Sequence, residues 1–482
     1  MIKPQLELSV RLDKIVGGGQ SLGTMDDGRK AFVWGGLPGE TVTFSVSKKK
    51  SKFVEGIVTS VTDASDQRVA PRDEASYLST SPWQMMSFDA EQHYKAALLE
   101  EAFELHDIVL PSPIDIYTDE IEYGYRNKIE FSWWGDTDDD GKETLDLAFF
   151  RRGSKGKIPV DGMSLARPEI NRLAIEIRDH LRSVSVSARR LKTLLIRCDQ
   201  AGNCVWQLYV KDQAIAAALS PAKAKAFPAQ GGEIIFSEPK SPASRITKRL
   251  TAYSDVSLQD TVLGTPFRYA AESFFQVNVP VYERALTDMA MWLPSSSAGL
   301  GQTASDENFA LPAKRGKTDD QMAPSEFSTK DGLAEAGHRS TPPRVLDLYS
   351  GVGTIGLTIG GPGVTLVESD ENAVREMRRN ILEQDIDAVP IHAPSEKAVE
   401  YITGDKLVIV DPPRAGLHAD VIAQLLEVKP ARIVYLSCNP VTQARDVGLL
   451  AEAYGIRHHQ GYNFFPRTPH IEHLVVLDLK AN

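Results

Sequence analysis

The chain has 482 residues, a length typical of two to four domains. Its composition, 42% hydrophobic and 25% charged, is that of a globular protein, and no run reaches the ~18 apolar residues that a membrane span needs. The net charge of −11 argues against an indiscriminate polyanion binder but leaves room for local basic surfaces. Three cysteines are too few for a disulfide framework and lack metal-ligand spacing. We therefore expect a protein of the reducing cytoplasm, without a signal peptide.

Residues 1–63 contain short β-rich runs separated by glycine turns, as in "ELSVRLDKIVGGGQSLG" and "KAFVWGG". This spacing predicts a small β-barrel. Lys48, Lys49 and Lys50 lie in the turn between its last two strands, where charge alone supports a solvated hairpin and an RNA contact about equally. "LPGETVTFSV" after "VGGGQSLG" resembles a TRAM domain, an oligonucleotide-binding type of barrel, and this resemblance implies RNA contacts.

Residues 64–260 mix helical and strand patterns, which predicts a central α+β domain. "AEQHYKAALLEEAFELHDI" has helical periodicity, whereas "YRNKIEFSWWG", "LDLAFFRRG", "TLLIRC" and "CVWQLYV" have the pattern of strands. Basic residues cluster twice beside aromatic ones, at residues 151–157 and 189–192. A single basic cluster is usually an ordinary solvent-exposed surface, whereas two basic clusters beside aromatic residues modestly favour RNA binding by this domain.

Residues 295–343 are dominated by small, polar and proline residues without an apolar period. Such a segment cannot bury enough apolar surface to offset its ordering entropy, so we predict a disordered insertion. It interrupts a third domain, residues 261–482, in which strands, glycine loops and helices alternate from "RVLDLYSGVGTIGLTIG" onwards. That alternation is typical of a doubly wound α/β sheet.

A glycine loop follows the first strand of this third domain. In "VLDLYSGVGTIG" the strand leads into Gly351 and Gly353, and the next strand ends about 20 residues later in Glu368, where a carboxylate can bind ribose hydroxyls. Asp347, at the end of the first strand, is either part of this cofactor site or simply a cap of the loop, and both interpretations stay open. Neither a dinucleotide fingerprint nor a P-loop is present, which favours S-adenosylmethionine over NAD or ATP. "DLYSGVGTIGL" also resembles the first motif of class I methyltransferases.

Chemically active side chains follow three further strands. "LVIVDPPRAGL" places Asp411 and Arg414 in a loop that two prolines hold rigid, at the edge where ligands bind in such sheets. "YLSCNP" places Cys438 at the end of the next strand, where a thiolate could act as a nucleophile if neighbouring donors or cations lower its pKa. Glu472, in "FPRTPHIEHLVVL", could act as a base.

Five motifs in order, "YRNKIEF", "AAESFFQVN", "DPPRAG", "YLSCNP" and "FPRTPHIE", closely resemble the RNA uracil-5-methyltransferases, which form 5-methyluridine. The resemblance implies that Cys438 adds to carbon 6 of uracil, that Glu472 removes the proton from carbon 5, and that Asp411 assists. It implies S-adenosylmethionine contacts at the following residues: Gln276, Tyr349, Gly351, Gly353, Thr354, Glu368 and Asp411. It implies RNA contacts at Arg126 and Phe150, around a flipped-out base.

The chain departs from these relatives in two places. Many carry a four-cysteine iron–sulfur cluster before "SFDAEQHYK", where this chain has no cysteine, so we expect no cluster. "VPIHAPSEKA" lacks the acidic residue that relatives often have near adenine.

We expect a monomeric enzyme without a membrane partner, acting on 23S ribosomal RNA in preference to transfer RNA. The preference for ribosomal RNA rests on the TRAM resemblance. The alternatives are a transfer-RNA uracil-5-methyltransferase and a non-catalytic RNA-binding protein of the same fold. A methyltransferase for another base or for protein is a further alternative within the enzymes, because amino-group methyltransferases often carry a similar "DPPY" loop.

Overall fold

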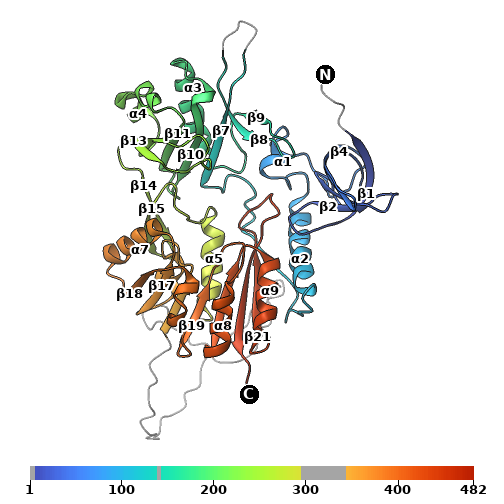
Figure 1. The fold of residues 1–482 in the computed structure, drawn as a ribbon, viewed down its shortest axis with the longest axis vertical. Helices are drawn as coiled ribbons and strands as arrows, with labels where there is room; N and C mark the ends of the chain where they lie inside the picture. Colours follow the sequence, from blue (N-terminus) through green and yellow to red (C-terminus); the bar gives the residue numbers. More distant parts are fainter. Residues whose placement is uncertain (1–5, 138–142, 295–343, 482) are drawn as a thin grey trace, which may run out of the picture.

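The computed structural model describes residues 6–137, 143–294 and 344–481. It begins with a closed barrel, drawn in blue in Figure 1, which confirms the predicted small β-barrel. The strands follow one another around it in the order β1-β2-β3-β5-β4. The strands are β1 (Glu7–Ile15), β2 (Ser21–Thr24), β3 (Lys30–Trp34), β4 (Thr41–Lys49) and β5 (Phe53–Asp63). Alternate residues such as Val10, Leu12, Val42 and Phe44 point inward and form its core.

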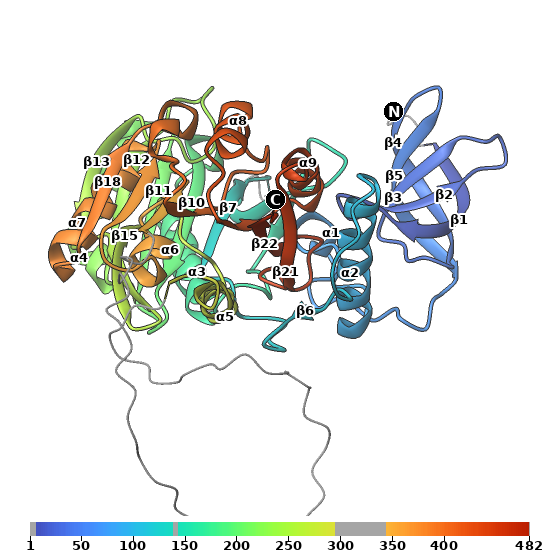
Figure 2. The ribbon, with the colours of Figure 1, turned by 90° about the horizontal axis from the view of Figure 1, so that it is seen from below.

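Helices α1 (Tyr77–Thr80) and α2 (Phe88–Glu104) and the short strand β6 (Ile116–Tyr117) follow the barrel. Ser87 caps α2 by accepting a hydrogen bond from the backbone of Ala90. Helix α2 lies between the barrel and the C-terminal sheet and packs against α9 (Pro440–Leu450) (Figure 2). Strand β6 pairs with β21 (Tyr454–Tyr462) of that sheet. The predicted domain boundaries at residues 63 and 260 stay predictions, but α2 and β6 pack with the C-terminal region.

The central sheet has the strand order β13-β12-β11-β10-β7-β8-β9. Its strands are β7 (Lys128–Trp134), β8 (Asp146–Phe150), β9 (Lys157–Val160), β10 (Leu191–Cys198), β11 (Cys204–Val210), β12 (Gly231–Phe236) and β13 (Lys248–Tyr253). Its helices are α3 (Pro168–Ser183), η1 (Ala188–Arg190), η2 (Gln213–Ala218) and α4 (Pro221–Ala226). A disulfide joins Cys198 to Cys204, which face each other in the β10–β11 register. The sequence patterns did not predict that these two cysteines pair.

A hairpin of β14 (Ser257–Val262) and β15 (Thr265–Ala270) and the helix α5 (Val279–Ala290) lead into the C-terminal sheet. That sheet has the order β18-β17-β16-β19-β20-β22-β21-β6. Its remaining strands are β16 (Arg344–Leu348), β17 (Val364–Glu368), β18 (Ala388–His392), β19 (Lys406–Val410), β20 (Arg432–Ser437) and β22 (Glu472–Leu479). Its helices are α6 (Thr354–Ile359), α7 (Glu371–Gln384), η3 (Ser395–Lys397), η4 (Val399–Tyr401), α8 (Ala419–Val428) and α9.

The C-terminal sheet is covered on both faces, because alternate residues of its strands enter two different hydrophobic cores. Val345 and Ile409 pack with α5, α6 and α7 on one face. Leu346 and Val408 pack with α8, α9 and the end of α2 on the other. This arrangement confirms the predicted doubly wound α/β sheet. The insertion predicted at residues 295–343 lies outside the described residues.

Candidate active site

The parallel strands of the C-terminal sheet, β16 to β20, end at one edge. The residues at or just beyond these ends are Tyr349, Glu368, Pro394, Asp411 and Cys438. Ligands bind in open α/β sheets at this carboxyl edge. The edge therefore gathers, from segments far apart in the chain, the side chains that the motifs singled out.

Strand β22 brings Glu472 to the same edge by running antiparallel to β20. In that register Ser437, the last residue of β20, lies opposite His473. Cys438 follows Ser437 and Glu472 precedes His473, so the thiol and the carboxylate lie beside each other at one end of the strand pair.

One cavity of about 730 Å³ opens at this edge. Cys438, Glu472 and Asp411 line it, together with four of the predicted cofactor residues. Those four are Gln276, Tyr349, Gly351 and Glu368. The cavity lies within the size range of small-molecule sites. The structure thus brings the predicted nucleophile, base and cofactor residues into a single space.

The glycine loop that forms one wall of the cavity adopts left-handed backbone conformations. The φ angles are 65° at Tyr349, 56° at Gly351 and 92° at Gly353. Glycine reaches this region without steric cost, whereas tyrosine is strained there, as residues at functional sites often are. Gly353 and Thr354 contribute to the start of α6 rather than to the lining, and the Thr354 hydroxyl lies 2.9 Å from the hydroxyl of Tyr282.

Asp347 serves as a cap of this loop, the second of the two interpretations left open above. Its side chain is fully buried, and Oδ2 accepts a hydrogen bond of 2.9 Å from the backbone N–H of Gly356. Burial raises the pKa of Asp347 to about 8, more than that hydrogen bond lowers it. The carboxyl group therefore joins the end of β16 to the first turn of α6, on the far side of the glycine loop.

Two carboxyl groups in the cavity have raised pKa values. Burial raises the pKa of Asp411 to about 7. Burial also raises the pKa of Glu472 well above its ordinary value, and the neighbouring charge of Asp411 adds to this effect. Carboxyl groups whose pKa values approach neutrality can accept and release protons under physiological conditions.

The pKa of the Cys438 thiol is also raised, whereas activation of the thiol as a nucleophile would require a lower pKa. Burial, followed by the charges of Glu472 and Asp411, raises its pKa to about 11. Arg414 acts in the opposite direction and lowers the pKa. Asn439 caps α9 and Pro440 occupies its first turn, so the positive end of the helix dipole also lies next to the thiol. In the ligand-free protein these favourable groups do not outweigh burial and the two carboxylates.

Arg414 is held in place from three sides. Its backbone carbonyl accepts hydrogen bonds from Asn439 Nδ2 at 2.8 Å and from the Thr442 hydroxyl at 3.2 Å. Its guanidinium lies 3.2 Å from Nδ1 of His470. Burial, helped by the positive charge of Arg414, lowers the pKa of His470 to about 4, so the imidazole is neutral and accepts this hydrogen bond.

A second pocket, of about 450 Å³, is lined by Arg414, which lies in the loop after β19. Arg126 and Lys128 line it, and so do the aromatic side chains of Phe149 and Phe465. Cationic groups beside aromatic rings suit a nucleotide, because the cations can meet phosphate and the rings can stack on a base. This pocket contains one of the predicted RNA-contacting residues, Arg126.

The other predicted RNA-contacting residues lie elsewhere. Phe150 is 62% exposed on the opposite face of β8 from Phe149, with Lys157 Nζ 5.0 Å from its ring centroid. Lys48, Lys49 and Lys50 are exposed on the barrel, but only Lys50 lies in the predicted turn, because β4 extends through Lys49. The guanidinium of Arg152 lies 3.9 Å from the ring centroid of Trp34, which connects the central sheet to the barrel.

Sequence reasoning missed several residues that line the cavity. Ser395 and Glu396, which the motifs did not single out, line it from the segment that follows β18. Phe274 also lines it and is 71% exposed. The sequence pointed to Phe274 only through its place in the "AAESFFQVN" motif, two residues before Gln276.

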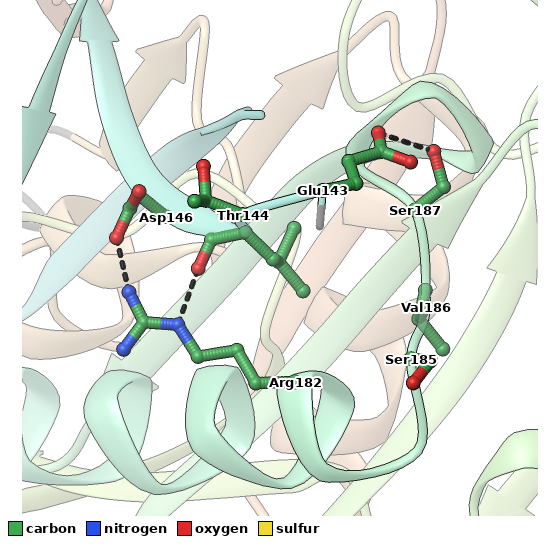
Figure 3. Close-up of a pocket in the computed structure, with 8 residues that line it drawn as sticks. Glu143, Thr144, Asp146, Arg182, Ser185, Val186 and Ser187 are labelled. Carbon is green, nitrogen blue, oxygen red and sulfur yellow. Dashed lines mark hydrogen bonds and ion pairs between the residues drawn. The ribbon is translucent and has the colours of Figure 1, made fainter. Parts of the chain in front are cut away.

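A further hollow, of about 440 Å³, lies between β8 and the end of α3 (Figure 3). Its polar groups already bind one another: Arg182 pairs with Asp146 and donates to the carbonyl of Leu145, and Ser187 donates to Glu143 at 2.7 Å. We assign it no function. Within residues 6–137, 143–294 and 344–481 no cluster of three or more His, Cys, Asp or Glu side chains is arranged to hold a metal ion. None of the helices in the same ranges is both long and apolar enough to span a membrane.

Similarity to known proteins agrees with the geometry. Residues 400–480 match the family described as tRNA (Uracil-5-)-methyltransferase. The chain is 26% identical to an uncharacterized RNA methyltransferase of Nitratidesulfovibrio vulgaris, over 98% of this chain and 96% of that protein. It is 26% identical to one of Enterococcus faecalis, over 92% of each.

Two similarities involve proteins of Pyrococcus abyssi. A tRNA (uracil(54)-C(5))-methyltransferase of that organism is 43% identical over 131 residues, which cover 27% of this chain and 31% of that protein. The crystal structure of a P. abyssi tRNA (uracil-54, C5)-methyltransferase in complex with S-adenosyl-L-homocysteine superposes with a TM-score of 0.72. That match has 19% identity and covers 98% of this chain and all of the other, and it confirms the fold.

Proposed function

We propose that this chain, which belongs to the RNA (uracil-5-)-methyltransferase family, transfers a methyl group from S-adenosylmethionine to carbon 5 of a uridine in RNA through a covalent adduct of Cys438. The observation that carries the proposal is the single cavity that Cys438 and Glu472 share with the predicted cofactor residues. A protein that only binds RNA would need neither a thiol nor a buried carboxyl group there.

The cavity residues fit a nucleoside-type methyl donor. The carboxylate of Glu368 is oriented by the backbone N–H groups of Gly351, Ser369 and Asp370, at 2.9, 2.7 and 2.7 Å, and it lines the cavity where a ribose would be bound. Gln276 is 7% exposed and contributes an amide to the same space. S-adenosylmethionine, when bound, supplies the methyl group and a sulfonium charge that favours ionised carboxylates.

The protein groups supply the remaining chemistry. Carbon 5 of uracil is a poor nucleophile, and addition of the Cys438 thiolate to carbon 6 converts the ring into an enolate that attacks through carbon 5. Asp411, with a pKa of about 7, is partly ionised at neutral pH and can accept the thiol proton. After methyl transfer Glu472 takes the proton from carbon 5, the ring double bond reforms, and the thiolate leaves.

The pocket that contains Arg126, Lys128 and Phe149 supports an RNA substrate whose target base is turned out of its stack. Arg414 lines this pocket and also lowers the pKa of Cys438, so the nucleotide-binding groups of the pocket lie near the proposed nucleophile. The exposed lysines of the barrel would extend this contact, in keeping with the TRAM-like role that we propose for the predicted domain of residues 1–63.

Ribosomal RNA is the first candidate substrate, from the resemblance of the barrel to TRAM domains. Transfer RNA is the second candidate, and one observation favours it. The P. abyssi structure named as a transfer-RNA enzyme matches 98% of this chain, so the match includes the barrel. Mapping 5-methyluridine in ribosomal and transfer RNA from a strain that lacks the gene separates the two candidates.

The test of the chemistry uses labelled S-adenosylmethionine and RNA that contains 5-fluorouridine. Fluorine cannot leave as a proton would, so wild-type protein should form a stable covalent adduct with this RNA, and Cys438→Ala should form none. Equal trapping by both proteins would refute the assignment of the nucleophile. If the wild type transfers no label to the uridines of any cellular RNA fraction, the proposed function is wrong.

A further inference from the structure

An irregular segment, residues 271–277, joins β15 to α5 and forms a wall of the active-site cavity. Glu272, Ser273, Phe274 and Gln276 line the cavity from this segment. The segment belongs to no helix or strand, so its backbone carbonyls need partners from outside. Those partners determine the position of residues 271–277 in the cavity wall.

A single arginine of the central sheet supplies most of the partners. Arg197, in β10, donates from one terminal nitrogen to the carbonyl of Ser273 and from the other to the carbonyl of Phe275, both at 2.6 Å. A longer contact of 3.5 Å reaches the carbonyl of Ala271. The planar guanidinium is suited to this geometry because its donors form a rigid fork.

The neighbouring strand β7 and the residue before it supply further partners. Asn127 donates from Nδ2 to the carbonyl of Gln276 at 3.1 Å and from its backbone N–H to the carbonyl of Val277 at 3.3 Å. Lys128 lies opposite Arg197 in the β7–β10 register, and its Nζ is 3.5 Å from the carbonyl of Glu272. The end of this strand pair therefore presents adjacent donors to one segment.

The environment of Arg197 indicates that its charged guanidinium binds these backbone carbonyls rather than a carboxylate. The side chain is fully buried, and no carboxylate in the described ranges lies within 4 Å of it as an ion-pair partner. Its guanidinium lies 4.7 Å from the ring centroid of Tyr269 and 5.8 Å from that of Phe275. Burying an arginine this completely is costly unless its donors are satisfied. Backbone carbonyls bind both terminal nitrogens of Arg197, and the rings of Tyr269 and Phe275 lie beside its guanidinium, while Nε has no hydrogen-bond partner among the described residues.

We propose that Arg197 is a positioning residue for the methyl-donor site: it fixes the backbone of residues 271–277 so that Gln276 and its neighbours stand at the correct place in the cavity. The inference rests on the proposed function. In each planar peptide the N–H points away from the C=O. Binding of the Ser273 and Phe275 carbonyls by Arg197 therefore turns the N–H groups of Phe274 and Gln276 away from the central sheet.

A role in packing alone and a role in positioning lead to different kinetic results. If Arg197 only supported the central sheet, its loss would lower the amount of folded protein and affect cofactor and RNA parameters together. A positioning role affects the cofactor first, because the segment lines the cofactor half of the cavity. The KM for S-adenosylmethionine should rise, while kcat at saturating cofactor and the Kd for RNA should stay unchanged.

The experiment measures binding of S-adenosylhomocysteine by calorimetry, without RNA, in the full-length protein. Arg197→Met should raise the Kd about tenfold or more, as expected when two buried hydrogen bonds to one segment are lost. Arg197→Lys keeps the charge and one donor direction, and should give an intermediate Kd. Arg190→Met is the matched control: Arg190 directly precedes β10 and pairs with Asp212 outside the cavity lining, with its side chain 40% exposed, and its loss should change the Kd less than about threefold.

Failure of the proposed function and failure of the positioning role of Arg197 give different results. If the wild type does not bind S-adenosylhomocysteine, the proposed function fails. If the wild type binds it and Arg197→Met binds it equally well, the positioning role is wrong. A parallel loss of RNA affinity and of kcat at saturating cofactor would also overturn it. Should Arg197→Met not fold, Arg197→Lys and Asn127→Ala carry the same test, since each weakens one carbonyl contact; unchanged Kd values in both would refute the proposal.

Discussion

The backbone N–H of Gly351 donates to Oε2 of Glu368 at 2.9 Å, which joins the glycine loop after β16 to the end of β17 inside the cavity. The other carboxylate oxygen accepts from the N–H groups of Ser369 and Asp370. The carboxylate is thus fixed before any ligand binds, and it faces the space where we propose that ribose is held.

Glu368→Gln should weaken cofactor binding. The amide keeps the size of the side chain but replaces one acceptor oxygen by a donor, so both the Gly351 contact and a contact to ribose hydroxyls are impaired. We expect the Kd for S-adenosylhomocysteine to rise about 10- to 100-fold, the range for loss of a hydrogen bond to a charged group. Calorimetry measures it. Glu371→Gln, at an exposed position of α7, is the matched control, and a similar Kd in the two variants would contradict the role of Glu368.

Glu472→Gln should block release of the product without blocking attack. Glutamine cannot take the proton from carbon 5, so the methylated adduct with Cys438 should accumulate on ordinary RNA. Gel electrophoresis under denaturing conditions should detect a protein–RNA band that carries the label from S-adenosylmethionine. Wild-type protein, which completes the cycle, should show little of this band. Multiple turnovers by Glu472→Gln at the wild-type rate would show that another group is the base.

The reactivity of Cys438 should depend on pH in a way that its neighbours control. Because its pKa is raised to about 11, alkylation by iodoacetamide in the RNA-free protein should accelerate with pH without a plateau below about pH 10. Cys438 is the chain's one unpaired cysteine, so the label reports on it alone.

Two substitutions should move that profile in opposite directions. Asp411→Asn removes a negative charge that raises the pKa of Cys438, and should speed alkylation at pH 8. Arg414→Met removes the positive charge that lowers the pKa, and should slow it. Changes of the same sign in both variants would mean that access to the thiol, rather than charge, controls the rate.

Asp347 should make the ligand-free protein less stable as pH rises. Its pKa is about 8 in the folded protein against an ordinary 3.8, so between about pH 4 and pH 8 the folded state holds a proton that the unfolded state has lost. The free energy of unfolding therefore falls as pH rises through this window. Asp347→Asn keeps an oxygen for the N–H of Gly356 and stays neutral, so this part of the loss should disappear.

Urea unfolding at pH 5, 6.5 and 8 checks the prediction for Asp347. The urea midpoint of Asp347→Asn should rise relative to wild type as pH increases. Asp370→Asn is the control for loss of a carboxylate, because Asp370 is an exposed cap of α7 and asparagine caps helices equally well. A constant difference between Asp347→Asn and wild type at all three pH values would contradict the prediction.

The individual motifs were predictable because each depends on local chemistry. The β-rich runs with glycine turns indicated the barrel, and the alternation of strands, loops and helices indicated the doubly wound sheet. The rule that ligands bind at the carboxyl ends of parallel strands was enough to group Asp411 and Cys438 at one edge. The placement of Glu368 at the end of the second strand follows from the same rule.

Other parts depended on contacts between distant segments. The hypothesis of an activated thiol at Cys438 could not anticipate that burial, Glu472 and Asp411 together outweigh Arg414. Pairing of Cys198 with Cys204 depends on the register of β10 with β11. Phe149 and Phe150 are adjacent and chemically alike, and only the direction of β8 decides which of them lines the pocket beside Arg126.

The sequence by itself determined which chemical groups the protein can use: a thiol, three carboxylates and a glycine loop at strand ends, in an order that resembles one family. The tertiary structure decided where those groups meet and in which state of protonation. Strand β22 had to run antiparallel to β20 for Glu472 to reach Cys438, and β10 had to pair with β7 for Arg197 to reach the carbonyls of residues 271–277. Burial, which sets both pKa values and hydrogen-bond partners, depends on the whole packed chain and not on any local run of residues.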